Sequence, residues 1–132
     1  MRFTSFQLNI GSKLFKALSE EARIRMLYLM YTNGEMCIAD IEHILEITQS
    51  KASRHISYLK NSGLLNIEKH DQWVYYSIKE EYMSIIPQIF SYLEKDTIIS
   101  NDQETFETLY ANNILAIRKL HNKQKVYKVM RK

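Results

Sequence analysis

The sequence predicts a mainly α-helical protein with one small β-hairpin, an α+β fold. Only three Gly and one Pro occur among 132 residues, so few positions interrupt a helix. Apolar residues recur at spacings of three and four along most of the chain, as they do on one face of a helix. Between residues 64 and 78 this spacing stops, and β-branched and aromatic residues typical of strands accumulate. A hydrophobic content of 45% is enough for one compact core.

Several helices are expected before residue 64. The first spans roughly residues 6–18 and is expected to bend near Gly11. Residues 19–34 form a second amphipathic helix that ends at Gly34. Two short helices follow, and only Glu46 and Ile47 separate them. Two helices joined by so tight a turn are typical of a helix-turn-helix.

The second helix of this pair, TQSKASRHISYLKNSG at residues 48–63, has an unusual polar face. Ala52, Ile56 and Leu59 recur at i, i+4 and i+7 and are expected to face the core. Thr48 is suited to cap the start and Gly63 to end the helix. The remaining face combines serines with Lys and Arg and contains no acid between residues 48 and 60. We therefore expect this face to bind an anionic partner.

A β-hairpin is expected directly behind this helix. Residues 64–68 and 73–78 are the two strands, and Lys69, His70, Asp71 and Gln72 join them. A hairpin in this position is a wing, whose polar tip is able to reach a phosphate backbone.

The chain after the hairpin is expected to contain two more helices. The first has an apolar face made by Tyr82, Ile85, Ile86, Ile89, Phe90 and Leu93. Pro87 fits there if Ser84 is the cap, and otherwise it should kink the helix. We expect residues 1–96 to form the winged helix-turn-helix domain. Residues 97–132 are expected to be an extension with one amphipathic helix and a basic tail.

Charge and composition narrow the function. The net charge is +3, but residues 118–132 alone contain seven cations and no acid, so the overall charge is weak support for a nucleic-acid partner. The single cysteine, Cys37, excludes an internal disulfide. Without a signal peptide or a long apolar run, a cytoplasmic protein with no membrane partner is expected. No nucleophile–base pair or phosphate-binding glycine loop is visible, which disfavours an enzyme.

The order KALSEEARIRML, EMCIADIEHIL, TQSKASRHISYLKNSGLL and WVYYSI resembles the ArsR/SmtB winged helix-turn-helix transcriptional regulators. The resemblance implies a homodimer that binds double-stranded DNA at a pseudo-palindromic operator and represses transcription until an effector releases it. Joining through the N-terminal and post-wing helices places these residues at the dimer interface: Leu14, Tyr82, Ile86, Ile89, Phe90 and Leu93. The implied DNA-binding residues are Gln49, Ser50, Lys51, Ser53, Arg54, His55, Tyr58, Lys60, Lys69, His70 and Gln72.

The sensing sites of this family are incomplete in the sequence. Cys37 and Asp40 match one Cys-x-x-Asp pair, but residues 1–36 contain no further Cys or His. The positions that match a second family site are Glu80, Tyr82, Leu93 and Asp96, which offer no imidazole. No cofactor is therefore expected, and the set of ligands for a metal or metalloid effector is incomplete.

Three alternatives stay open at this point. A winged helix is also used as a protein–protein interaction module, although an acid-free recognition helix argues against that use here. Among regulators, the effector is either a metal or thiol-reactive compound sensed at Cys37, or a small organic molecule or partner protein.

Overall fold

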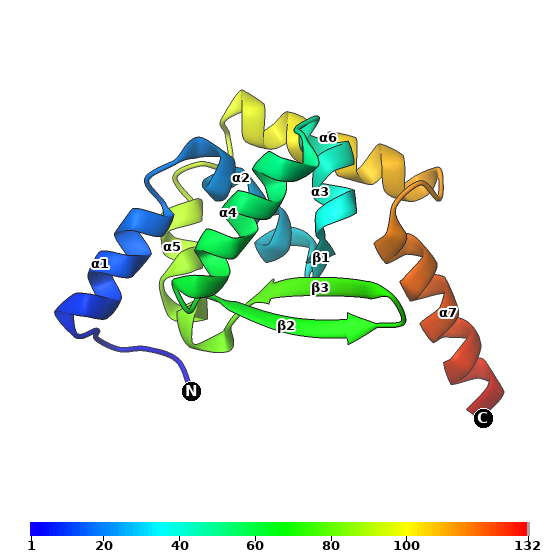
Figure 1. Ribbon diagram of the computed structural model, residues 1–132, viewed down its shortest axis with the longest axis horizontal. Helices are drawn as coiled ribbons and strands as arrows, with labels where there is room; N and C mark the ends of the chain where they lie inside the picture. Colours follow the sequence, from blue (N-terminus) through cyan, green and yellow to red (C-terminus); the bar gives the residue numbers. More distant parts are fainter. Residues whose placement is uncertain (132) are drawn as a thin grey trace.

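The computed structural model describes residues 1–131, and side chains through residue 126. Seven α-helices, a short 3₁₀ helix and three strands follow one another in this part of the chain (Figure 1). The helices are α1 (Leu8–Ala17), α2 (Glu21–Asn33), α3 (Ile38–Leu45), α4 (Gln49–Asn61), α5 (Ile86–Phe90), α6 (Thr97–Ala111) and α7 (Ala116–Arg131). The strands are β1 (Met36–Cys37), β2 (Leu65–His70) and β3 (Trp73–Ile78), and the 3₁₀ helix is Glu80–Ser84.

The predicted helix-turn-helix and wing are present. Helices α3 and α4 are separated by three residues, of which Glu46 has a left-handed backbone with φ of 54°. The hairpin β2–β3 follows α4, and its tight turn places Asp71 at φ of 57°. Strand β1 adds a third antiparallel strand that the sequence did not predict, in the order β1-β3-β2. The mostly helical fold with a winged helix-turn-helix is thus confirmed.

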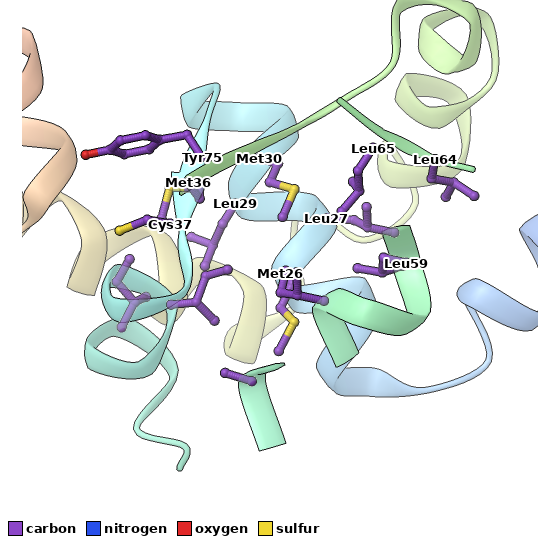
Figure 2. Close-up of a cluster of buried hydrophobic side chains, with 14 of the residues drawn as sticks. Met26, Leu27, Leu29, Met30, Met36, Cys37, Leu59, Leu64, Leu65 and Tyr75 are labelled. Carbon is purple, nitrogen blue, oxygen red and sulfur yellow. The ribbon is translucent and has the colours of Figure 1, made fainter. Parts of the chain in front are cut away.

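The core lies between α2, α4 and the sheet. Figure 2 shows apolar side chains from these elements converging on one another. They include Met26, Leu27, Leu29 and Met30 of α2, Met36 and Cys37 of β1, Leu59 of α4, and Leu64, Leu65 and Tyr75 around the hairpin. Burial of each large apolar side chain stabilises the fold by roughly 1.5 to 3 kcal/mol. The helix-turn-helix is therefore anchored to a well-packed body.

The helix predicted over residues 82–93 is broken in the structure. The 3₁₀ helix is followed by the short α5, with Pro87 in the first turn of α5, where a missing backbone N–H costs little. Helix α1, by contrast, continues through Gly11 without the expected interruption. The segment after the wing is therefore two short helices and presents no long helical face.

Most of the residues expected at a dimer interface lie inside this chain's own core. Leu14 and Ile86 are 0% exposed, and Phe90 is 1% exposed. Phe90 packs against the rings of Tyr28 and Tyr31. Tyr82 is buried as well, and its ring packs against Phe3 and Phe6 of the N-terminal segment. These four residues are thus corrected to core residues, while Ile89 and Leu93 are half-buried.

The chain after residue 96 forms two helices where one was expected. Helix α6 is joined to α2 by Asp102, whose two carboxylate oxygens each accept a bond of 2.8 Å from Arg25. Helix α7 begins beside α3, and Leu115 and Ile117 enter the hydrophobic core. Of the predicted basic tail, the side chains of Lys128, Arg131 and Lys132 lie outside the described residues. Part of α6 and the start of α7 therefore pack on the same core as the winged helix.

Helices α1 and α7 lie at opposite ends of the molecule, and the tip of the hairpin points toward α7 (Figure 1). Among the described residues, none of the helices is both long and apolar enough to cross a membrane.

Candidate nucleic-acid interface

Helix α4 presents the predicted polar face to solvent. Its buried side contains Ala52, Ile56 and Leu59, as the spacing predicted. Thr48 caps the helix by accepting a bond of 3.2 Å from the backbone N–H of Lys51. The exposed members of the predicted set are Gln49, Ser50, Lys51, Arg54, Tyr58 and Lys60, and Ser53 is half-buried. The helix is thus an exposed, acid-free surface on a rigid apolar base.

His55 does not belong to this surface, which corrects the sequence-based prediction. Its side chain is 1% exposed, and its Nδ1 atom lies 3.3 Å from a guanidinium nitrogen of Arg23. Nε2 has no hydrogen-bond partner among the described residues, and the nearest carboxylate, Glu20, lies 3.7 Å away. Burial and the nearby cation Arg54 lower the pKa of His55, so the neutral imidazole is favoured.

Arg23 is a residue that contacts α4 and that the sequence analysis missed. This buried side chain of α2 donates to the backbone carbonyls of Ala17 and Lys16 at 2.9 and 2.8 Å, at the end of α1. The same guanidinium lies 4.0 Å from the ring centre of Tyr58, over its face. Arg23 therefore joins α1, α2 and α4. A charged residue on the inward side of an amphipathic helix was the signal available in the sequence.

The tip of the wing is only partly as predicted. Lys69 and Gln72 are exposed. Asp71 is paired with Lys123 of α7 at 2.7 Å, and this lysine lowers the pKa of the Asp71 carboxyl. The one acidic side chain at the tip is thus neutralised by α7. His70 instead turns toward the protein, where its ring packs against Tyr75.

The proposed sensing pair of Cys37 and Asp40 is already engaged in the fold. Cys37 is 2% exposed, and burial together with the charge of Asp40 raises the pKa of its thiol to about 12. Both oxygens of Asp40 accept bonds from the first backbone N–H groups of α7, at 2.8 Å from Ala116 and 2.9 Å from Ile117. Asp40 is therefore a helix cap, and the thiolate that a soft metal requires is disfavoured.

The second family site is also not assembled. Tyr82 lies in the core, and Asp96 caps α6 by accepting bonds from Ile98 and Ile99. The structure instead brings together Glu35, Glu68 and His70, which the sequence analysis did not connect.

Known proteins resemble this chain in sequence and in fold. The profile of the bacterial regulatory proteins of the arsR family matches residues 20–66, which run from the cap of α2 into β2. An arsenic resistance transcriptional regulator of Pseudomonas putida is 34% identical over 90 residues, which are 68% of this chain and 67% of the relative. A cadmium resistance regulatory protein homolog of Staphylococcus aureus is 38% identical over 72 residues, 54% of this chain and 60% of the relative.

Among solved structures, HlyU from Vibrio cholerae aligns with a TM-score of 0.58 at 28% identity, over 65% of this chain and 96% of HlyU. The matched sequence relatives are transcriptional regulators, which is consistent with the exposed, acid-free face of α4 and with the wing. The chain belongs to the arsR family of bacterial regulatory proteins, and it is a DNA-binding transcriptional regulator and not an enzyme.

Proposed function

We propose that the protein is a homodimeric repressor that reads a pseudo-palindromic operator with α4 and touches the flanking backbone with its wing. The observation that carries the proposal is the exposed, acid-free face of α4. Arg54 is suited to bond guanine in bidentate fashion and Gln49 to bond adenine. Serines and lysines of the same face are suited to phosphate: Ser50, Lys51, Ser53 and Lys60. Lys69 and Gln72 at the wing tip extend this surface. A DNA partner also implies a location in the bacterial cytoplasm.

The way in which α4 is fixed in the fold favours base-specific recognition of DNA over nonspecific electrostatic attraction. Base recognition requires side chains held within a fraction of an ångström, which a fixed helix provides and a mobile one does not. Buried residues lie along α4, and Arg23 braces it from α2 through His55 and Tyr58. Tyr58 itself is 39% exposed, and its hydroxyl is suited to bond a phosphate.

The outer face of α1 supports a dimer. Leu8 is 90% exposed and Phe15, two turns later, is 66% exposed. Gly11 and Ser12 lie between them along an apolar groove. Large apolar side chains in such a patch commonly mark an interface. A twofold axis beside α1 produces two α4 helices for two half-sites, which is the arrangement that a pseudo-palindromic operator matches.

The DNA-binding proposal is tested by operator titration of Arg54→Ala. The operator is first found by selecting bound sequences from a random DNA pool. We expect Arg54→Ala to weaken operator binding by about 1 to 3 kcal/mol without changing the melting temperature. Arg2→Ala is the matched control, because it removes the same charge outside α4 and the wing. Unchanged operator binding by Arg54→Ala would contradict the assignment, and weak binding without sequence preference would favour a protein-interaction module.

The dimer is tested by Phe15→Glu in sedimentation experiments. Placing a charge in the α1 patch should convert the dimer to a monomer, because the carboxylate loses water on association. Ile98→Glu, at another exposed apolar residue, is the control and should remain dimeric. A monomeric parent protein at micromolar concentration would contradict the dimer itself.

We infer that the effector is not a soft metal held by thiolates of this chain. The Pseudomonas putida relative is named for arsenic resistance, but arsenic binding by thiolates needs several cysteines. This chain has one, and it is buried. We infer that release depends on another signal, and Cys37→Ser should leave both operator binding and release unchanged.

A further inference from the structure

Three side chains from distant parts of the sequence converge on one side of the wing, near the end of β2. Glu35 precedes β1, whereas Glu68 and His70 are two residues apart on β2 and leave the same face of that strand. One ligand atom of each residue lies within 4.8 Å of the other two. Two carboxylates and one imidazole therefore share a small volume.

The distances within this group do not fit hydrogen bonds. Nε2 of His70 lies 3.4 Å from a Glu68 oxygen and 3.7 Å from a Glu35 oxygen. A hydrogen bond between imidazolium and carboxylate is shorter, about 2.7 to 2.9 Å. Nε2 is shielded from solvent and has no hydrogen-bond partner among the described residues. A buried nitrogen of this kind needs a partner, and the described part of the chain supplies none.

A metal ion between the three groups would satisfy these distances. Zinc binds histidine nitrogen and carboxylate oxygen at about 2.0 to 2.2 Å, so two ligands at a tetrahedral angle lie about 3.4 Å apart. Octahedral ligands at the same bond length would lie about 3.0 Å apart. The separations from His70 to the two glutamates are close to the tetrahedral value.

The surroundings hold the imidazole and leave one side open. The ring of Tyr75 packs edge-on against His70, with ring centres 5.4 Å apart. The side chains of His70 and Glu35 are 24% and 25% exposed, whereas Glu68 is 67% exposed. A water molecule therefore has access to a fourth coordination position.

We propose that Glu35, Glu68 and His70 form a binding site for a divalent cation of the zinc class. The imidazole binds through Nε2 and keeps its proton on Nδ1, and the charges of the two carboxylates balance the ion. The site is separate from the Cys37 and Asp40 pair and needs no thiolate. Because Glu35 leads through β1 into α3, a bound ion joins the wing to the helix-turn-helix. Binding of the metal does not depend on the proposed operator.

The test is Zn²⁺ binding by isothermal titration calorimetry on the full-length, untagged protein. We expect one ion per chain. Glu68→Gln should weaken binding about tenfold or more, since even outer partners of a metal site contribute about that much. His70→Asn and Glu35→Gln should have similar effects. Glu68 is exposed and Gln has its shape, so the fold should be unaffected.

Matched controls separate this site from adventitious binding. Glu104→Gln removes an exposed carboxylate on α6, His43→Asn removes an exposed imidazole on α3, and Cys37→Ser removes the thiol. All three should bind Zn²⁺ as the parent does. Co²⁺ bound to the parent should show the strong visible absorption of a tetrahedral site, and Glu68→Gln should lose it.

The proposal would be overturned if the parent binds no Zn²⁺ at tens of micromolar, or if Glu68→Gln and His70→Asn retain the affinity of the parent. Loss of binding in Cys37→Ser would also overturn it and would place the ion at the thiol. Operator binding without metal distinguishes failure of this site from failure of the proposed repressor.

Discussion

Helices α4 and α7 are both positively charged, but the fold supports them very differently. Neither contains an acid, and each contains several lysines and arginines. Buried residues recur along the whole length of α4, whereas α7 is fixed mainly at its start, where Asp40 caps it and Ala116 and Ile117 are buried. After Leu120 and His121, its described side chains are exposed. Positive charge attracts DNA in both cases, but only a helix fixed along its length is suited to read bases.

The largest expected effect comes from the apolar side of α4. Leu59→Ala removes a fully buried side chain and should lower the free energy of unfolding by about 2 to 5 kcal/mol. Urea denaturation measures this change. Arg54→Ala, on the opposite side of the same helix, is the control and should unfold at the parent's midpoint. Equal loss of stability in both variants would contradict the division of α4 into a buried side that stabilises the fold and an exposed side that does not.

The cap of α7 should have the next largest effect. Asp40→Asn replaces one acceptor oxygen with a donor and leaves a buried N–H of α7 unpaired, which should cost about 1 to 3 kcal/mol. Hydrogen exchange at Ala116 and Ile117 should speed up along with the loss in urea denaturation. Asp71→Asn, at an exposed ion pair, should leave stability unchanged. Full protection of both amides in Asp40→Asn would show that α7 is held by its apolar contacts alone.

A smaller effect on DNA affinity should distinguish the role of α7 from that of α4. Lys125→Ala on α7 should weaken binding to operator and to unrelated DNA equally, because an exposed lysine contributes charge without sequence reading. Any change in the salt slope should be at most about one unit. Titrations on both DNAs at two salt concentrations provide the comparison with Arg54→Ala. If Lys125→Ala altered the preference for operator, α7 would be a reading element.

The smallest expected effect is a pH dependence from His55. Its folded-state pKa lies below the ordinary value of about 6.5, mainly because of burial. As pH falls below about 6.5, the unfolded chain takes up a proton before the folded chain does, so stability decreases toward the folded pKa. Between pH 7.5 and 5.5, His55→Asn should reduce this dependence. His43→Asn, at an exposed histidine, should retain it.

Local periodicity was enough for much of the fold. The positions of α2, α3, α4 and the hairpin follow from apolar spacing and from the change to strand-forming residues. The cap at Thr48 followed from its side chain. The spacing was also enough to place His55 correctly. His55 is three residues after Ala52 and four before Leu59, so it lies on the buried side of α4. Its chemical type had suggested DNA contact instead.

The sequence by itself determined which segments are helices or strands and that α4 has an acid-free face, because these depend on neighbours a few residues apart. The tertiary structure decided what covers each apolar stripe. It placed Leu14, Ile86 and Phe90 in the core of one chain and left Phe15 outside. It also directed Asp40 to the start of α7 and gathered Glu35, Glu68 and His70. The physical reason is that these contacts join residues far apart in the chain, whose approach depends on packing of the whole core and not on any local pattern.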